Sequence, residues 1–253
     1  MRLTFLGTGT SCGVPVVGCQ CEVCRSTDPH DNRLRTSAML ETDTTRILID
    51  CGPDFRQQTL RIPYGKIDAV LLTHIHYDHV GGMDDLRPFC AFGDIDVYAN
   101  ASTVDSLHST MPYVFGENLY PGVPKLNLHV AEPHKEFTVG DITVMPFVVN
   151  HKKLPIFAYR FGSFAYITDM KTIPDADREK LQGVKTLVVN ALRFTLQHPA
   201  HLLVDEAIAF SRSIGAEKVY FIHTTHDIGF HDEANAKLPE GFMFAYDGMT
   251  IEI

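Results

Sequence analysis

Short apolar runs along the first half of the chain predict β-strands separated by connections rich in Gly, Pro and Asp. The strands are expected over residues 2–7, 37–42, 46–51, 68–73 and 95–100, with helices over 54–61 and 102–109. Asp54 follows Pro53 and stands where a side chain can cap the first of these helices. A long connection punctuated by Pro and Gly is expected from 111 to 124.

The second half continues the alternation of strands and helices. Strands are expected near 126–130, 141–149, 156–161, 163–168, 185–190 and 218–223. Leu203, Ala207, Phe210 and Ile214 recur at helical spacing before Gly215, which predicts a helix there. The chain closes with apolar runs over 242–246 and 249–253 around an Asp-Gly turn. Runs of strands broken by well-spaced helices predict an α/β layered sandwich with helices outside packed sheets.

Composition narrows the class of protein. The 253 residues are 45% hydrophobic, enough for one large core, and we expect a single domain over 1–253. No apolar run reaches the roughly 18 residues of a membrane span, and the start lacks a signal peptide, which predicts a soluble cytoplasmic protein with no membrane partner. The formal charge of -9 argues against a broad nucleic-acid surface. A small anionic substrate held by bound metal ions is compatible with that charge.

The stretch HIHYDHVGG, residues 74–82, concentrates metal-binding side chains directly after a buried strand. His74 and His76 alternate to one side, while Asp78 and His79, on a tighter turn, can face a second point a few Å away. Imidazole and carboxylate suit Zn, Mn or Fe, and a pair of such metals is an established device for attacking phosphoryl groups. The competing interpretation is that these residues are solvated loop histidines or parts of a buried polar network. It accounts for a single histidine better than for four such residues after one strand.

Three later strands each end on a single ligand-type residue. The segments VVNHKK, AYITD and VYFIHTTH place His151, Asp169 and His223 at predicted strand ends. Each alone is compatible with an ordinary structural role. Together they repeat one pattern, which predicts that they supply the remaining ligands of a dinuclear site at one edge of the sandwich.

A second cluster is formed by cysteines. Cys19, Cys21 and Cys24 lie within six residues, which favours one closed, tetrahedral zinc site over a disulfide framework. The fourth ligand must come from outside the motif, and His226 is the first choice, with His30 and His231 as alternatives. The remaining three cysteines are expected to be ordinary core or loop residues: Cys12, Cys51 and Cys90.

The pattern T-H-x-H-x-D-H-x-x-G, with the later strand-end His, Asp and His, resembles the metallo-β-lactamase superfamily over nearly the whole chain. The resemblance implies a four-layer αββα sandwich. It also implies one metal held by His74, His76 and His151, a second held by Asp78, His79 and His223, and Asp169 bridging the two. Secreted lactamases carry a cysteine where this chain has Asp169, and diiron relatives carry a carboxylate in place of His76. Both departures favour the phosphodiesterase branch.

The stretch GTGTSCGVPVVGCQCEVC, with RLRTSAML after it, resembles a narrower group: the cyclic phosphodiesterase of the carbon-phosphorus lyase (phosphonate) pathway and its relatives. That group implies a structural zinc insertion, here at about 12–35, tied to the last His-containing strand. A pyrroloquinoline quinone biosynthesis protein shares the cysteines but tends to lack the full catalytic ligand set. The resemblance also implies that His201, just before a helix, assists the leaving oxygen. Whether His198 shares this role stays open.

The function predicted from these features is hydrolysis of a small phosphodiester such as 5-phosphoribosyl 1,2-cyclic phosphate. Two divalent metals, Zn or Mn with Fe as a further option, would activate water, with His201 and Asp78 as catalytic residues and one structural Zn elsewhere. Arg193 is either a phosphate contact or part of a surface ion pair. Alternatives are a tRNA 3'-processing nuclease, a thioesterase of the same fold, and a metal-stabilised binding protein. The oligomeric state stays open, with a homodimer as a candidate because relatives of this build are often dimers.

Overall fold

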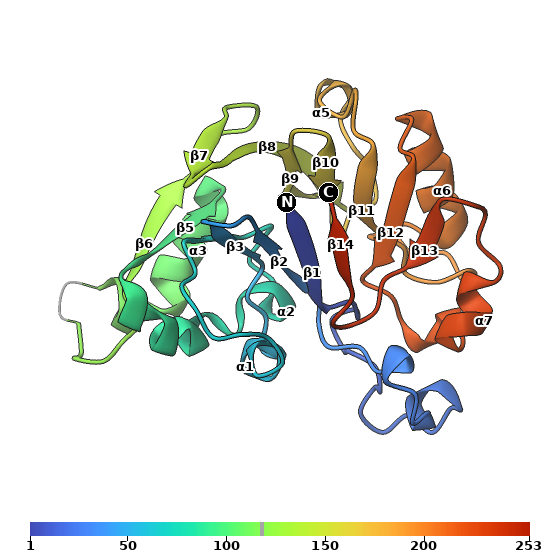
Figure 1. Cartoon of the computed structure of the whole chain (residues 1–253), viewed down its shortest axis with the longest axis horizontal. Helices are drawn as coiled ribbons and strands as arrows, with labels where there is room; N and C mark the ends of the chain where they lie inside the picture. Colours follow the sequence, from blue (N-terminus) through green and yellow to red (C-terminus); the bar gives the residue numbers. More distant parts are fainter. Residues whose placement is uncertain (117–118) are drawn as a thin grey trace.

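The computed structural model describes residues 1–116 and 119–253, and within them two seven-stranded sheets pack against each other (Figure 1). The first sheet contains, in spatial order, β14 (Thr250–Glu252), β1 (Arg2–Gly7), β2 (Ser37–Glu41), β3 (Arg46–Ile49), β4 (Ala69–Leu71), β5 (Ile95–Ala99) and β6 (Leu126–Val130). The second contains β13 (Phe242–Phe244), β12 (Lys218–Ile222), β11 (Thr186–Asn190), β10 (Phe164–Tyr166), β9 (Leu154–Phe161), β8 (Ile142–His151) and β7 (Phe137–Val139).

Helices cover the outer face of each sheet (Figure 1). The first sheet is covered by α1 (Phe55–Thr59), η3 (Met83–Phe92), α3 (Ala101–Thr110) and α4 (Pro112–Phe115). The second is covered by α6 (Val204–Ser213) and α7 (His231–Asn235), and α5 (Asp175–Glu179) lies beside β8. The remaining elements are α2 (Tyr77–Val80) and the short 3-10 helices η1 (Val23–Arg25), η2 (Pro29–Asp31) and η4 (His226–Ile228). The predicted four-layer αββα sandwich is therefore confirmed.

Side-chain alternation along the strands explains the layers. In β2, Ala38 and Leu40 face the second sheet, while Met39 packs under the helices of the first sheet. In β3, Ile47 and Leu48 divide between the two faces in the same way. Burying both faces of these short strands gives three apolar layers, and this burial is the main force that holds the sandwich together.

The parallel strands set the position of the functional edge. Strands β3 to β6 run parallel in one sheet, and β10 to β13 run parallel in the other. The residues that follow β3, β4, β10 and β12 carry the polar side chains described below. In parallel α/β sheets, sites collect where the carboxyl ends of such strands meet.

One local prediction was wrong. The side chain of Asp54 does not cap α1; its carboxylate instead accepts hydrogen bonds from the backbone N–H of Arg35, at 2.8 Å, and from the Arg35 guanidinium. The predicted Asp-Gly turn is present at 247 and 248, between β13 and β14, which belong to different sheets. Asp247 is half-buried and accepts hydrogen bonds from Thr8 and Leu34, so it ties this turn to the first part of the chain.

The connection predicted from 111 to 124 contains the helical turn α4, which the sequence pattern did not indicate. Its residues 117 and 118 lie outside the described part of the chain. Strand β7 was also missed, because its three residues are too few for a periodic signal. Of the helices in the described ranges, not one has the length and apolarity that a membrane crossing demands.

Candidate metal centre

The chain directly after β4 supplies the first group of candidate ligands. His74 is buried and His76 is exposed, and the turn of helix that follows directs Asp78 and His79 inward. Gly82 makes this turn feasible, since a Cβ there would lie 2.0 Å from the carbonyl oxygen of Gly52. Four metal-binding side chains thus emerge from one short segment, as the sequence predicts.

The second sheet supplies the other three. Asp169 follows β10, His223 follows β12, and His151 is the last residue of β8. Asp169 and His223 adopt the left-handed backbone region, with φ of 54° and 56°. Non-glycine residues in this region cost on the order of 1 to 3 kcal/mol each and cluster at functional sites. The strain therefore supports a functional reason for aiming these two side chains toward the first sheet.

The seven predicted side chains converge in space from both sheets. Ligand atoms of four residues lie within 4.8 Å of one another: Asp78, His79, Asp169 and His223. The carboxylate of Asp169 is 3.2 Å from His223 Nε2 and 3.4 Å from His79 Nε2, and on its other oxygen 3.9 Å from His74 Nε2. The ring of His76 completes this side, 4.5 Å from the His74 ring and 5.2 Å from the His151 ring between centroids. Asp169 therefore lies between two groups of imidazoles.

Hydrogen bonds on the far side of the rings fix how three imidazoles point. Nδ1 of His79 donates to the Asp50 carboxylate at 2.7 Å, and Nδ1 of His151 lies 3.0 Å from the carbonyl oxygen of Asp169. Nδ1 of His74 lies 3.0 Å from the hydroxyl of Thr73, which itself donates to Asp50. Each ring thereby turns the lone pair of its Nε2 toward the centre, which is the tautomer that a metal ligand requires.

The donor set fits divalent cations. The inward nitrogens of the buried histidines have no hydrogen-bond partner within the described chain: Nε2 of His74, His79 and His223. Buried polar atoms are rarely left in this state without a reason. Burial lowers the pKa of His74, which keeps it neutral. Burial would raise the pKa of Asp78, but the neighbouring imidazoles of His223 and His79 lower it. Neutral imidazole and ionised carboxylate are the forms that bind metal.

His201 also reaches this centre. Its ring stacks on His223 at 4.8 Å and on His198 at the same distance on its other side, and its Nδ1 lies 3.9 Å from Asp169. Burial and the charge of His223 lower the pKa of His201 to about 2, so the ring is neutral at ordinary pH. It can offer an N–H as a hydrogen-bond donor, but not a permanent positive charge. His198 is more exposed and one ring farther from the centre.

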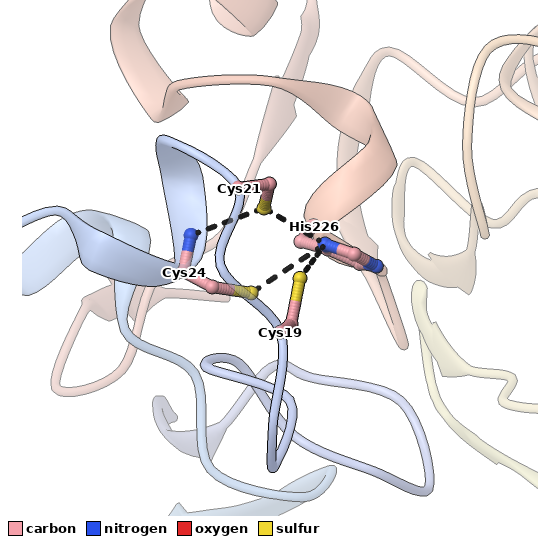
Figure 2. Close-up of side chains that lie close together, drawn as sticks. All are labelled: Cys19, Cys21, Cys24 and His226. Atoms are coloured by element: carbon pink, nitrogen blue, oxygen red, sulfur yellow. Dashed lines mark hydrogen bonds between the residues drawn. The ribbon is translucent and has the colours of Figure 1, made fainter.

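The cysteine cluster converges at a separate point, on His226 (Figure 2). The Sγ atoms lie 3.1 to 3.5 Å from Nδ1 of His226: Cys19, Cys21 and Cys24. Tetrahedral zinc with ordinary Zn–S and Zn–N bonds separates sulfur from nitrogen by about 3.5 Å. The hydrogen bond to His226 lowers the pKa of Cys21 to about 6, whereas burial raises that of Cys24 to about 11. The donor set fits zinc, whose binding would displace the remaining thiol protons.

The two alternative ligands for the cysteine site lie elsewhere. His30 stacks on Tyr246 at 4.2 Å and lies 5.1 Å from the ring of His231. Nδ1 of His231 accepts a hydrogen bond from the buried guanidinium of Arg33. Among the histidines of the described ranges, His226 is therefore the one that the fold brings to the three sulfurs. Of the remaining cysteines, Cys51 is buried in the core, Cys90 is half-buried and Cys12 is exposed.

Sequence reasoning missed two supporting groups. Asp50 is fully buried and receives bonds from His79, from the Thr73 hydroxyl and from the Thr73 backbone N–H. The signal was present, because Asp50 follows the apolar strand RILI as Asp169 follows its own strand. Lys171 donates to both oxygens of Glu206 in α6 and so ties the Asp169 turn to that helix. No short-range pattern indicates this second pair.

Replacing Asp50 with Asn should weaken metal binding at the centre 10- to 100-fold, the usual effect of losing a carboxylate that orients a metal-binding imidazole. The measurement is titration of metal-depleted protein with Zn²⁺ against a competing chelator. Asp96→Asn is the matched control, because Asp96 lies 2.8 Å from Nε2 of the half-buried His129 in the same kind of pair, away from the metal centre. Equal affinities for the two variants would remove the orienting role of Asp50.

Comparison with known proteins agrees with this geometry. Residues 45–224 match a family described as the Beta-lactamase superfamily domain. The chain belongs to the beta-lactamase superfamily. A solved structure described as a new diphosphatase from the PhnP family shares 40% identity and a TM-score of 0.91, covering 100% of this chain and 97% of that one. The predicted superfamily and the likeness to a PhnP-family protein are thereby confirmed.

Two curated relatives add to this picture. A Porphyromonas gingivalis protein named octanoyltransferase is 46% identical over 250 residues, 98% of this chain and 51% of that protein. A ribonuclease Z of a Bradyrhizobium species is 28% identical over 168 residues, 64% of this chain and 50% of that protein. The chain spans about half the length of the curated relatives it matches. The first name therefore assigns no acyl transfer to the shared region.

Proposed function

We propose that the chain is a metal-dependent hydrolase of phosphodiesters that acts on a small substrate such as 5-phosphoribosyl 1,2-cyclic phosphate. The observation that carries the proposal is the convergence of six other histidine and aspartate side chains from both sheets around the carboxylate of Asp169. The likeness to a solved PhnP-family diphosphatase supports the coarser class, hydrolysis at a phosphorus centre. A formal charge of -9 favours a small substrate over a long nucleic acid.

Two divalent cations, Zn or Mn with Fe as a further option, would polarise a phosphoryl oxygen and lower the pKa of a water molecule there. His74, His76 and His151 would hold one cation, and Asp78, His79 and His223 the other. Asp169 would join the two groups. Cys19, Cys21, Cys24 and His226 would hold a structural zinc.

His201 would assist the leaving alcohol. Its ring lies against His223 and within 3.9 Å of the Asp169 carboxylate, at the rim of the ligand set. Because its burial favours the neutral ring, it would act by donating an N–H hydrogen bond as negative charge develops on the departing oxygen. The ionised carboxylate of Asp78, turned toward the same space, would orient the attacking water.

Three rivals use related chemistry. A tRNA 3'-processing nuclease is favoured by the ribonuclease Z relatives, but such an enzyme needs a long basic arm to grip its substrate, and the sequence holds no such insertion. A thioesterase would use the same metals without needing the cysteine site. A metal-stabilised binding protein would retain the structural zinc and turn nothing over.

A substrate panel with metal-reconstituted protein separates these functions. It contains ribose 1,2-cyclic phosphate, cyclic nucleotides, a diphosphate diester, pre-tRNA, an acyl thioester and bis(p-nitrophenyl) phosphate. We expect turnover of the small diesters, and a loss of at least about 100-fold in His76→Ala, because that side chain lies at the open side of the ligand set. His108→Ala, on an exposed face of α3, is the control. Preferred turnover of pre-tRNA or thioester, or none at all, would reassign the function.

A further inference from the structure

The loop over residues 191–203 joins β11 to α6 and carries both His198 and His201. Backbone bonds close its base: the N–H of Leu192 donates to the carbonyl oxygen of Leu202 at 2.9 Å, and the N–H of Val204 donates to that of Arg193 at 3.1 Å. Between these bonds the chain turns outward, and Leu196 at the turn is 70% exposed with a φ of 63°. His201 lies at the end of this turn, between two further contacts of the loop: the carbonyl oxygen of Ala200 is 3.1 Å from Nδ1 of His151, and the N–H of Leu202 donates to the carbonyl oxygen of Met170 at 3.0 Å.

Arg193 holds the turn from inside the loop. Its Nε donates to the carbonyl oxygen of Leu196 at 3.0 Å, and its Nη1 donates to the carboxylate of Asp227 at 3.2 Å. The Arg193 side chain is 20% exposed, so most of it is covered. With these two bonds in place, Arg193 belongs to an ion pair. The planar guanidinium suits this bridge, because its donors keep a fixed relative direction.

Asp227 connects this bridge to the cysteine cluster. It follows His226 in η4, and Figure 2 shows the His226 ring directed into the three sulfurs. The hydroxyl of Thr225 donates to the same Asp227 carboxylate at 3.1 Å, and the N–H of Thr225 donates to the carbonyl oxygen of Leu192 at 3.0 Å. A continuous set of bonds thus runs from the cysteines through η4 to Leu192 at the base of the loop and, through Arg193, to Leu196 at its outward turn.

We infer that Arg193 is a positioning residue, which transmits the order of the cysteine cluster to residues 194–201 and so holds His201 against His223. The cysteine site would then contribute to the reaction rate in addition to stability. The kinetic part of this inference rests on the proposed function, whereas the ordering of the loop can be measured without it.

The sizes of the expected effects on stability and on reaction rate distinguish a positioning role of Arg193 from a purely stabilising one. Partly exposed ion pairs contribute little to global stability, so losing this one should shift the unfolding midpoint by less than about 4 °C. A displacement of a reacting group by about 1 Å can cost up to about 100-fold in rate. Arg193→Met should therefore lower kcat about 10-fold with KM changed less than about 2-fold, because a positioning residue acts through His201 and not through a contact with the substrate.

The test uses the full chain loaded with metal. The kinetics of Arg193→Met, Asp227→Asn and the double variant are measured on bis(p-nitrophenyl) phosphate, with metal content and amide hydrogen exchange of residues 194–201. We expect faster amide exchange in residues 194–201 and unchanged metal content for all three variants. The kcat of the double variant should be no lower than that of the slower single variant, since both changes break the same bridge. Lys185→Met is the control. Lys185 forms an exposed ion pair with Glu217 directly before the first residue of β11, at the end of the strand away from the loop.

Two results would overturn the inference. One is a rate of amide hydrogen exchange in residues 194–201 of Arg193→Met that equals the rate in the parent protein. The other is a rise in KM of about 10-fold with kcat unchanged, which would make Arg193 a substrate contact. If the parent protein turns over none of the phosphodiesters, the proposed function fails on its own account, and the exchange of residues 194–201 still decides whether Arg193 orders the loop.

Discussion

Asp169→Ala should lower kcat on bis(p-nitrophenyl) phosphate by about 1,000-fold or more. The Asp169 carboxylate lies within 3.9 Å of ring nitrogens of four histidines: His74, His79, His201 and His223. It is the one carboxylate that reaches both sides of the ligand set among the described residues. Its removal would cost several kcal/mol of charge stabilisation, and each 1.36 kcal/mol corresponds to about a tenfold change in rate.

The same variant should lose metal at the centre and keep the zinc of the cysteine site. Metal content of the purified protein, measured beside the kinetics, distinguishes loss of the site from loss of the fold. Asp141→Ala is the control carboxylate, because Asp141 is exposed and bonds only to threonines of the first sheet and its own backbone. A kcat within 10-fold of the parent, with the fold intact, would show that the reaction does not depend on Asp169.

The sequence indicated the ligand set because each member ends or follows an apolar strand. His151, Asp169 and His223 come from strands far apart in the chain, yet parallel strands bring their carboxyl ends to one edge. The ligand-type residues at strand ends and the spacing of HIHYDH are local features, so both can be recognised in the sequence alone. The same logic, applied consistently, would also have found Asp50.

The features that the sequence did not predict depend on contacts between segments far apart in the chain. Asp54 was expected to cap α1, but Arg35, 19 residues earlier, takes both of its oxygens. The Asp-Gly turn was predicted, but its hydrogen bonds to Thr8 and Leu34, more than 200 residues earlier, were not. The long-range bonds of Asp54 overrode its local preference for capping, and those of Asp247 have no local signal in the sequence. The bridge from Arg193 to Asp227 belongs to the same class.

Cys21→Ser should remove the zinc of the cysteine cluster and lower the thermal unfolding midpoint by about 10 °C. The cluster ties residues 19–24 to His226, about 200 positions later, so the bound ion closes a very long loop. A ligand present at about 1,000 times its dissociation constant stabilises a protein by about 4 kcal/mol, and for a chain of this size each kcal/mol corresponds to about 2 to 4 °C. A chelator should lower the midpoint of the parent by a similar amount.

Cys12→Ser is the matched control, because Cys12 lies in the same segment of chain but is exposed and outside the cluster. It should keep the parental midpoint and one zinc more than Cys21→Ser. Cys21→Ser should also turn over substrate more slowly even at temperatures where it is fully folded, since η4 and the loop over 194–201 lose their anchor. If the two serine variants bind equal amounts of zinc, the four side chains of Figure 2 do not form a metal site.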